Sequence, residues 1–467
     1  MSGDGSGLSE LETKPSLREA FWVWCRVAML SFGGPAGQIA VMHRILVEEK
    51  RWVSESRFLH ALNFCMLLPG PEAQQLATYI GWLLNRTLGG LIAGLLFVLP
   101  GFLSILGLSV LYAGYHDLTI VQGIFYGIKP AIIAIVIQAV IRIGKRSIKN
   151  SMMFAIAIAA FVSIYFLQVP FPWIVLIAGT IGYCGGRIWP EKFVVIKGHG
   201  PQNSSESAPT TADEFSILEQ PSRARSLRVL AIWLVIWFLP IIGLIAFTGR
   251  DSVYSEQAMF FSKAAVVTFG GAYSVLAYVA QEAVATHHWL RPGEMLDGMG
   301  MAESTPGPLI QVVQFVGFMG AYRNPGSLHP MLAGVIGSVV TTWVTFAPCF
   351  LWIFVGAPYI EALRGRDSLN AALSAITAAV VGVILNLSLW FALQTIFGEV
   401  SERSIGAVRV LVPIWSTIDY AALLIAAAAL IALFRFRRGM ISTLLFSALV
   451  GMGWYMCVAP AETGIFG

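Results

Sequence analysis

Long apolar segments recur along the whole chain and limit what it can fold into. Residues 131–141 read AIIAIVIQAVI and residues 421–434 read AALLIAAAALIALF, without a single charged side chain. Strands of an outer-membrane barrel would alternate apolar and polar residues, which these runs do not. Only 12% of the residues are charged, whereas a soluble domain carries about 25%. The sequence therefore predicts an all-α polytopic membrane protein, with the lipid bilayer as its surroundings.

The few charged residues also narrow the range of functions. The net charge is only +4 over 467 residues, and Lys and Arg gather at the ends of apolar segments. This distribution orients helices in a membrane and argues against nucleic-acid binding. The first twenty residues are polar and hold acids and bases. Because they lack an apolar core, we expect no removable signal peptide.

The chain repeats itself at an offset of 237 residues. The stretch SFGGPAGQ at 31–38 aligns with TFGGAYSV at 268–275. Pro-Gly-Pro at 69–71 aligns with Pro-Gly-Pro at 306–308. Farther along the offset becomes 248, which aligns VLPGF with FAPCF. Motifs that recur in the same order predict two homologous halves.

The repeat divides the chain into four expected parts. The segment between the halves is rich in Ser, Pro and Gly, so it has no apolar face to bury and should be a flexible linker. The apolar run after it has no counterpart in the first half. We expect a first repeat at 1–190, a cytoplasmic linker at 191–226, an unpaired membrane helix at 227–250 and a second repeat at 251–467.

Each half offers six candidate membrane segments. In the first half they lie near 18–46, 57–84, 88–113, 119–143, 151–168 and 171–189, and in the second near 256–285, 294–321, 329–356, 370–396, 411–434 and 440–459. With the connecting helix, we expect about 13 segments. The positive-inside rule places the basic loops RIGKRSIK and RFRR in the cytoplasm, with the N-terminus inside and the C-terminus outside. The halves are then inverted, and re-entrant hairpins in place of the first two segments of each half would leave this arrangement unchanged.

Both halves interrupt a membrane segment with Pro-Gly-Pro. Proline removes backbone hydrogen bonds and ends the preceding helix, so a new half-helix starts inside the protein with its amides pointing inward. Such a helix start attracts anions, and inverted repeats with broken helices are typical of secondary transporters. A plain turn between two helices is the alternative. The predicted substrate-binding residues here are Pro69, Gly70, Pro71, Gln74, Thr305, Pro306, Gly307, Pro308 and Gln311.

The duplicated Phe-Gly-Gly motif is the second part of the predicted site. Glycine allows a backbone to approach a ligand or another helix without a Cβ atom in the way. The alternative is that these glycines serve close helix packing alone. The predicted substrate-binding residues of these motifs are Gly33, Gly34, Pro35, Gln38, Gly270 and Gly271.

Cations within the apolar segments indicate the charge of the substrate. Arg26 and Lys263 are repeat mates, and each lies seven residues before a glycine pair, on the same helical face. Two buried cations would suit a small dianion, whereas snorkelling to the interface is the alternative. Lys129 lies deeper in its segment and has Thr377 as its mate. It is a single-copy candidate for binding or gating.

Two acids beside the Pro-Gly-Pro motifs are candidates for proton coupling. Glu72 follows the first motif directly, and Glu303 precedes the second. A carboxylate removed from water can carry a proton. The two are not mates, since Glu72 aligns with Leu309 and Glu303 with Met66. For Glu72, stabilisation of a helix start is the alternative.

The stretches SFGGPAGQIAVMHR, LNFCMLLPGPEAQQLATYIGW and STPGPLIQVVQFVGF resemble the chromate transporter family, in its long form with two such domains. The resemblance covers nearly all of both halves. It implies an inner-membrane carrier that exports chromate, driven by the proton motive force, and confers chromate resistance. Sulfate, another tetrahedral dianion, is the expected competitor. Leu309 at the place of Glu72 argues against equal roles for the two halves.

Several alternatives remain open. The protein could instead import or exchange sulfate or another oxyanion, or it could be a channel. A membrane-embedded enzyme acting on an anionic substrate is less favoured, because no nucleophile and base stand at a recognisable spacing. We expect no cofactor, no metal and no catalytic residue. A homodimer is compatible with these assignments.

Overall fold

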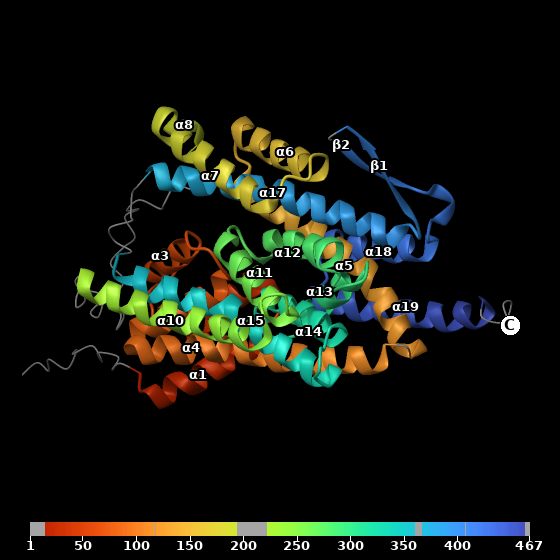
Figure 1. Cartoon of the computed structure of the whole chain (residues 1–467). Coiled ribbons are helices and arrows are strands. Elements are labelled where there is room, and N and C mark those ends of the chain that lie inside the picture. The colour runs from red at the N-terminus through yellow and green to blue at the C-terminus, as the bar shows by residue number, and fades with distance from the viewer. Residues whose placement is uncertain (1–14, 117, 194–221, 360–366, 407, 463–467) are drawn as a thin grey trace, which may run out of the picture.

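The computed structural model describes residues 15–116, 118–193, 222–359, 367–406 and 408–462. These ranges are mostly helical, and seven of their helices are long and apolar enough to cross a membrane by length and composition. In Figure 1, α6, α7 and α17 form the upper layer of the view, and α1, α4, α10 and α15 form the lower one. The predicted class, an all-α polytopic membrane protein with repeats, is confirmed. The predicted linker lies largely outside the described residues.

The first half consists of broken helices followed by long ones. Its elements are α1 (Leu17–Leu30), α2 (Gly34–His43), η1 (Arg44–Glu49), α3 (Glu55–Cys65), α4 (Glu72–Tyr115), α5 (Thr119–Ser147), α6 (Ser151–Tyr165), α7 (Phe171–Ile188) and the short α8 (Pro190–Phe193). The expected first segment is broken at Phe-Gly-Gly and the second at Pro-Gly-Pro. The break at Pro-Gly-Pro occurs where the sequence analysis places it, whereas the break at Phe-Gly-Gly divides the expected segment 18–46, which was predicted as one span.

The second half follows the same order after the connecting helix. Its elements are α10 (Arg223–Thr248), α11 (Val253–Val267), α12 (Ala272–Gln281), η3 (Glu282–Thr286), α13 (Glu294–Ser304), η4 (Leu309–Gln311), α14 (Val312–Arg323), α15 (Pro330–Gly356), η5 (Ala357–Tyr359), α17 (Asp367–Ile396), β1 (Val400–Ile405), β2 (Val408–Pro413), η6 (Trp415–Thr417), α18 (Tyr420–Phe434) and α19 (Met440–Glu462). Here too the first two segments are broken.

The α4 segment is two helices joined by a tight turn. Asn85 and Arg86 leave the helical region, with Arg86 at φ +57°. Beyond the turn the chain folds back on itself. The close contact shows this: a Cβ atom on Gly81 would lie 2.4 Å from the carbonyl oxygen of Gly89. The expected segments 57–84 and 88–113 are therefore separated at this turn. Glycines at the contact allow the two helix backbones to touch.

One expected segment is partly wrong. Residues 400–413, where the span 411–434 was to begin, form an antiparallel β-hairpin, and the helix starts only at Tyr420. The strand VRVLVP alternates β-branched residues with others, which favours an extended chain. Gly406, at φ +63°, forms the turn, and Arg409 pairs with Glu402 across the strands. The apolar character of the second strand had made it look like part of the helix.

One long helix from each half packs against helices of the other half. The fourth long segment of the first half, α5, packs against α18 and α19, and its repeat mate α17 packs against α6 and α7. Close backbone contacts hold these pairs. A Cβ atom on Gly127 would lie 2.0 Å from the carbonyl oxygen of Ser447, and one on Gly182 would lie 2.6 Å from that of Ala371. Without a hydrophobic force between helices in lipid, such close packing is a main source of association.

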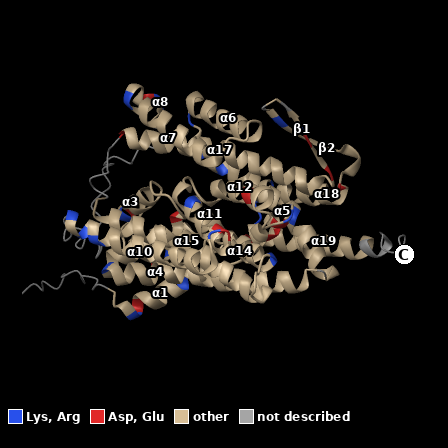
Figure 2. Cartoon of the chain, viewed as in Figure 1, with Lys and Arg blue, Asp and Glu red and all other residues tan. Residues whose placement is uncertain are grey.

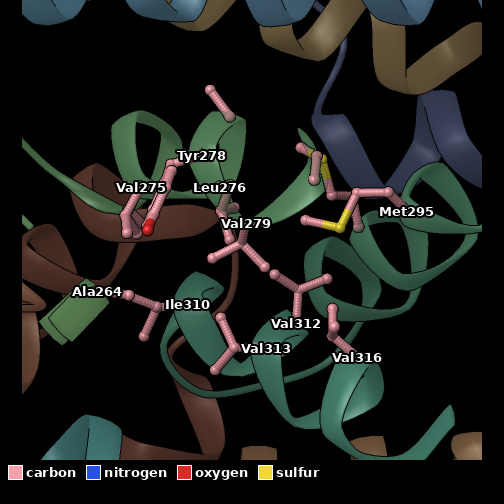
Figure 3. Close-up of a cluster of buried hydrophobic side chains, with 14 of the residues drawn as sticks. Ala264, Val275, Leu276, Tyr278, Val279, Met295, Ile310, Val312, Val313 and Val316 are labelled. Atoms are coloured by element: carbon pink, nitrogen blue, oxygen red, sulfur yellow. The ribbon is translucent and has the colours of Figure 1, made fainter. Parts of the chain in front are cut away.

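Apolar side chains fill the space between the broken helices of the second half. Figure 3 shows Val275 and Leu276 from α12 lying over Ile310 and Val313 from η4 and α14. All four are buried. This packing fixes the angle at which the broken helices meet.

The chain ends of the halves lie at opposite ends of the molecule. The loop after α5 and the end of the first half lie together, because the side-chain amide of Asn150 donates to the carbonyl oxygen of Lys192 in α8 at 2.7 Å. In Figure 1, α8 and the start of α10 lie on the left, and the end of α19 lies on the right. This arrangement agrees with a linker and a C-terminus on opposite sides. The orientation in the membrane stays a prediction.

Candidate functional site

All four glycines of the Phe-Gly-Gly motifs have positive φ angles. They are +86° at Gly33, +69° at Gly34, +75° at Gly270 and +100° at Gly271. L-residues rarely adopt such angles. A Cβ atom on Gly33 or Gly34 would meet nothing within 4 Å, so close helix packing does not explain these two. The backbone turn itself requires glycine.

The two Pro-Gly-Pro motifs are each bonded to the other half of the chain. The amide of Gly70 donates to the carbonyl oxygen of Thr268 at 2.7 Å, and the amide of Gly307 donates to that of Ser31 at 3.0 Å. Gly70 and Gly307 are repeat mates, and so are Ser31 and Thr268. The same bond therefore forms twice, related by the repeat. We call residues 31–34, 69–71, 268–271 and 306–308 the central junction.

A second reciprocal contact closes the junction. A Cβ atom on Gly307 would lie 2.9 Å from the Cα atom of Gly101, and one on Gly70 would lie 2.9 Å from the Sγ atom of Cys349. Gly101 and Cys349 are mates at the offset of 248 and follow the helix prolines Pro100 and Pro348. Each Pro-Gly-Pro motif is thus held between two segments of the opposite half.

These bonds define which backbone amides the anion-site hypothesis can use. The amides of Gly70 and Gly307 are already bonded and do not point at a ligand. The amides available are those of the following turns, where Pro71 is the N-cap of α4 and Pro308 that of η4, neither with a side-chain cap. Pro71 and Pro308 are buried, while Pro69 and Pro306 are half-buried.

Buried glutamines surround the junction. Gln38 donates to the carbonyl oxygen of Gly307 at 2.6 Å, and Gln75 donates to that of Pro69 at 2.7 Å. Gln74 donates to Thr78, and Gln311 donates to Gln314. Among the described residues, the side-chain oxygens of three of these glutamines have no hydrogen-bond partner: Gln74, Gln75 and Gln311. Gln75, which the sequence analysis missed, follows Gln74 directly, and only the fold shows that both are buried.

Both candidate acids reach the same loop of the second half. Glu303 is fully buried and accepts a hydrogen bond from the hydroxyl of Tyr273, while its other oxygen has no partner among the described residues. The Oε1 atom of Glu72 lies 3.9 Å from the Cβ position of Gly271. Although they are not repeat mates, the fold brings both acids beside the second Phe-Gly-Gly motif.

Two arginines that the sequence analysis assigned to a basic loop lie within electrostatic range of these acids. Arg142 and Arg146 stand one turn apart on α5, and both are exposed. The charge of Arg142 acts on Glu303, and that of Arg146 acts on Glu72. A nitrogen of Arg146 also lies 2.7 Å from the sulfur of Met66, just before the first Pro-Gly-Pro. Their spacing of four residues places them on one helical face, a signal available in the sequence.

The proposed cation pair of Arg26 and Lys263 is not brought together. Arg26 forms an ion pair with Glu49 at 2.7 Å, and its side chain is 52% exposed. Lys263 is exposed on α11. No hydrogen bond or ion pair within the described ranges joins the two.

The other predicted residues take local positions. Pro35 stands in the first turn of α2 and is half-buried. Thr305 caps the end of α13, and its hydroxyl lies 3.4 Å from the carbonyl oxygen of Ala302. Lys129, the single-copy candidate, forms an ion pair with Asp297 of the second half at 3.4 Å. Figure 2 shows charges of both signs in the middle of the molecule, near α5, α12 and α14.

Two interlocked repeats with broken helices and buried carboxylates at their contact define a class, the membrane transporters built from internal repeats. The chain belongs to the chromate transporter family, whose model matches residues 18–183 and 255–452. It is 28% identical to the chromate transport protein of Cupriavidus metallidurans, over 82% of this chain and 84% of the relative.

Two further relatives agree. Identity to the chromate transport protein of Pseudomonas aeruginosa is 31%, over 79% of each chain. Identity to the probable chromate transport protein of Synechococcus elongatus is 27%, over 82% of this chain and 86% of the relative. No solved structure matches the chain. The family indicates a transporter, and not an enzyme.

Proposed function

We propose that this protein is a secondary active transporter that exports chromate across the inner membrane, coupled to the proton motive force, and so confers chromate resistance. One observation carries the proposal: the reciprocal bonds of Gly70 to Thr268 and of Gly307 to Ser31. They bring a half-helix start from each half to the interface of the repeats, where such carriers bind their substrates.

The groups around the junction suit a small dianion. Arg142 and Arg146 supply two positive charges, and the uncapped first turn of α4 supplies backbone amides. Charge-assisted hydrogen bonds from such donors are the strong ones. Chromate and sulfate are both tetrahedral dianions, so sulfate should compete for the same groups. Arg26 is less suited, because it is already paired with Glu49, and Lys263 on α11 forms no hydrogen bond or ion pair with these groups among the described residues.

Glu72 and Glu303 are the proposed proton carriers at the junction. Glu303 is buried with one oxygen that has no partner among the described residues, and Glu72 is half-buried beside the same loop. Removal of a carboxyl group from water allows it to carry a proton. Each acid also lies in the field of an arginine. The carboxylates and a bound anion therefore compete for the same two cations, which links protonation to anion binding.

Flux measurements in membrane vesicles test the proposal. Inverted vesicles that contain the protein should accumulate radiolabelled chromate when they are energised, and an uncoupler should abolish this accumulation. Excess sulfate should reduce it. Accumulation only in right-side-out vesicles would instead indicate an importer, and flux that does not saturate would indicate a channel.

A second substrate is distinguished in the same experiment. Sulfate has the shape and charge that the proposed groups recognise, which favours a sulfate or oxyanion exchanger as the second candidate. Energised uptake of labelled sulfate that excess chromate cannot reduce would select that candidate and reject chromate export.

A further inference from the structure

The first half and the second half are also joined by a buried ion pair away from the central junction. The ammonium of Lys129 on α5 lies 3.4 Å from Oδ2 of Asp297 on α13. The hydroxyl of Tyr112, near the end of α4, donates to the same oxygen at 2.8 Å. Lys129 and Tyr112 belong to the first half and Asp297 to the second. The carboxylate thus connects the halves by two contacts.

The carboxylate of Asp297 lacks part of its hydrogen bonding. Its side chain is 0% exposed, and among the described residues its Oδ1 atom has no hydrogen-bond partner. A buried carboxylate with a free oxygen is costly in a membrane protein. Lys129 is 30% exposed, so its end of the pair reaches the surface of the fold. A proton that reaches this pair would remove the cost of the buried charge.

A neighbouring ion pair provides the contrast. Arg323 holds both oxygens of Glu294, at 2.6 and 2.8 Å, and the backbone amide of Arg291 donates to Oε2 at 2.7 Å. These residues all belong to the second half, and the pair is fully bonded. Protonation of Glu294 would weaken bonds within the second half and free no connection between the halves.

The charges around Asp297 balance while it is ionised. The titratable and charged groups around Asp297 are Tyr112 on α4 with His116 just after that helix, Lys129 on α5, Glu294 one turn before it on α13, and Arg323 on α14. The other acid of α13, Glu303, lies at the central junction, and the other cations of α5 lie toward its far end. The described parts of η4 and α19, which also pack on α13, contribute no charged side chain before Glu462. Two acids face two bases. One added proton therefore leaves one unbalanced positive charge, on Lys129.

We propose that Asp297 is a proton-coupling site, with Lys129 and Tyr112 as its positioning partners. A proton taken up by Oδ1 neutralises the carboxylate, and the attraction to Lys129 is lost. The contact between α5 and α13 then weakens, which allows the halves to move relative to each other. Release of the proton restores the pair. This inference rests on the proposed proton-coupled transport and adds a site distinct from Glu72 and Glu303.

The test separates coupling from transport itself. Purified protein in proteoliposomes is assayed for chromate accumulation driven by a pH gradient, and for chromate exchange at equal pH on both sides. Asp297→Asn should lose gradient-driven accumulation and keep exchange. The double variant Lys129→Gln with Asp297→Asn should behave in the same way as Asp297→Asn. It leaves no unpaired buried charge that would hinder folding. Asp297→Glu should restore part of the gradient response.

Matched controls exclude a merely structural role. Tyr126, on the same helix as Lys129, donates to both oxygens of Asp419 at 2.7 Å. Tyr126→Phe should leave the gradient response unchanged, whereas Tyr112→Phe should shift its pH dependence. Gradient-driven accumulation that persists in the double variant would overturn the inference. A wild type that exchanges chromate without any gradient response would instead contradict the proposed coupling.

Discussion

The helices α5 and α17 are repeat mates with the same place in the fold and opposite chemistry. Each packs against the last two helices of the other half. Yet α5 carries four cations, Lys129, Arg142, Lys145 and Arg146, whereas the only charged residue of α17 is Asp367 at its first position. At the offset of 248, Thr377, Trp390 and Gln394 stand where three of these cations are.

The difference shows that the two halves share a backbone frame but not a binding surface. The bonds at the central junction are made by main-chain atoms and glycines, and they occur in both halves. The cations come from the first half alone, and Asp297 and Glu303 come from the second. Variants that break the frame should therefore have the largest effects, and variants of exposed charges the smallest.

Gly307→Ala should have the largest effect on the frame. Its new Cβ atom would lie 2.9 Å from the Cα atom of Gly101, and φ is +106°. Strain in the backbone should cost about 1–2 kcal/mol, and overpacking about 1–3 kcal/mol more. Thermal unfolding in detergent should show a marked loss of stability.

Gly70→Ala is the matched variant in the first half. Its Cβ atom would meet the side-chain ends of Gln75 and Cys349, which can move. We expect the backbone strain alone, about 1–2 kcal/mol. Equal loss of stability in both variants would contradict the contact between Gly307 and Gly101.

Arg142→Gln and Arg146→Gln should come next and affect binding with the fold intact. Loss of a charge-assisted hydrogen bond of about 1.5–3 kcal/mol corresponds to about tenfold to a hundredfold weaker chromate binding. Lys145→Gln, an exposed neighbour on the same helix, is the control and should bind normally. Equilibrium dialysis with labelled chromate measures all three. Normal affinity in both arginine variants would remove α5 from the site.

Arg26→Gln and Lys263→Gln should have the smallest effect. An exposed ion pair such as that of Arg26 with Glu49 contributes about 0–1 kcal/mol. We expect little change in stability and an unchanged half-saturation for chromate and for sulfate competition. A strong loss of affinity in the double variant would restore these two residues as ligands and displace Arg142 and Arg146.

Local patterns in the sequence predicted the repeat, the breaks at Pro-Gly-Pro and the importance of the duplicated Phe-Gly-Gly glycines, though not that these glycines turn the chain. These features depend on neighbouring residues, because a few adjacent positions determine a Pro-Gly-Pro break or a positive φ angle. The bond of Gly70 to Thr268 was not predictable, because nothing local tells which distant loop accepts an amide. The same holds for Asp297 near the start of the expected segment 294–321, because nothing local tells that the fold buries it beside Lys129.

The errors have physical causes too. Arg142 and Arg146 read as an interfacial basic loop, since positive charge follows the end of an apolar run in both cases. The helix α5 instead continues to Ser147 and keeps both arginines on one face. The last three residues of the second β-strand, 411–413, were assigned to a membrane span because apolar residues match a helix equally well over so short a length.

A disulfide between the halves tests the interlocked junction most directly. In Gly70→Cys, the new Cβ atom would lie 2.9 Å from the Sγ atom of the native Cys349, a distance compatible with a disulfide. A protease site introduced near residue 205 then cuts the chain between the halves. We predict that oxidised protein stays one full-length species on a non-reducing gel and separates after reduction, and that adding Cys349→Ser abolishes the link. Two separate fragments without reductant would contradict the junction and the site built on it.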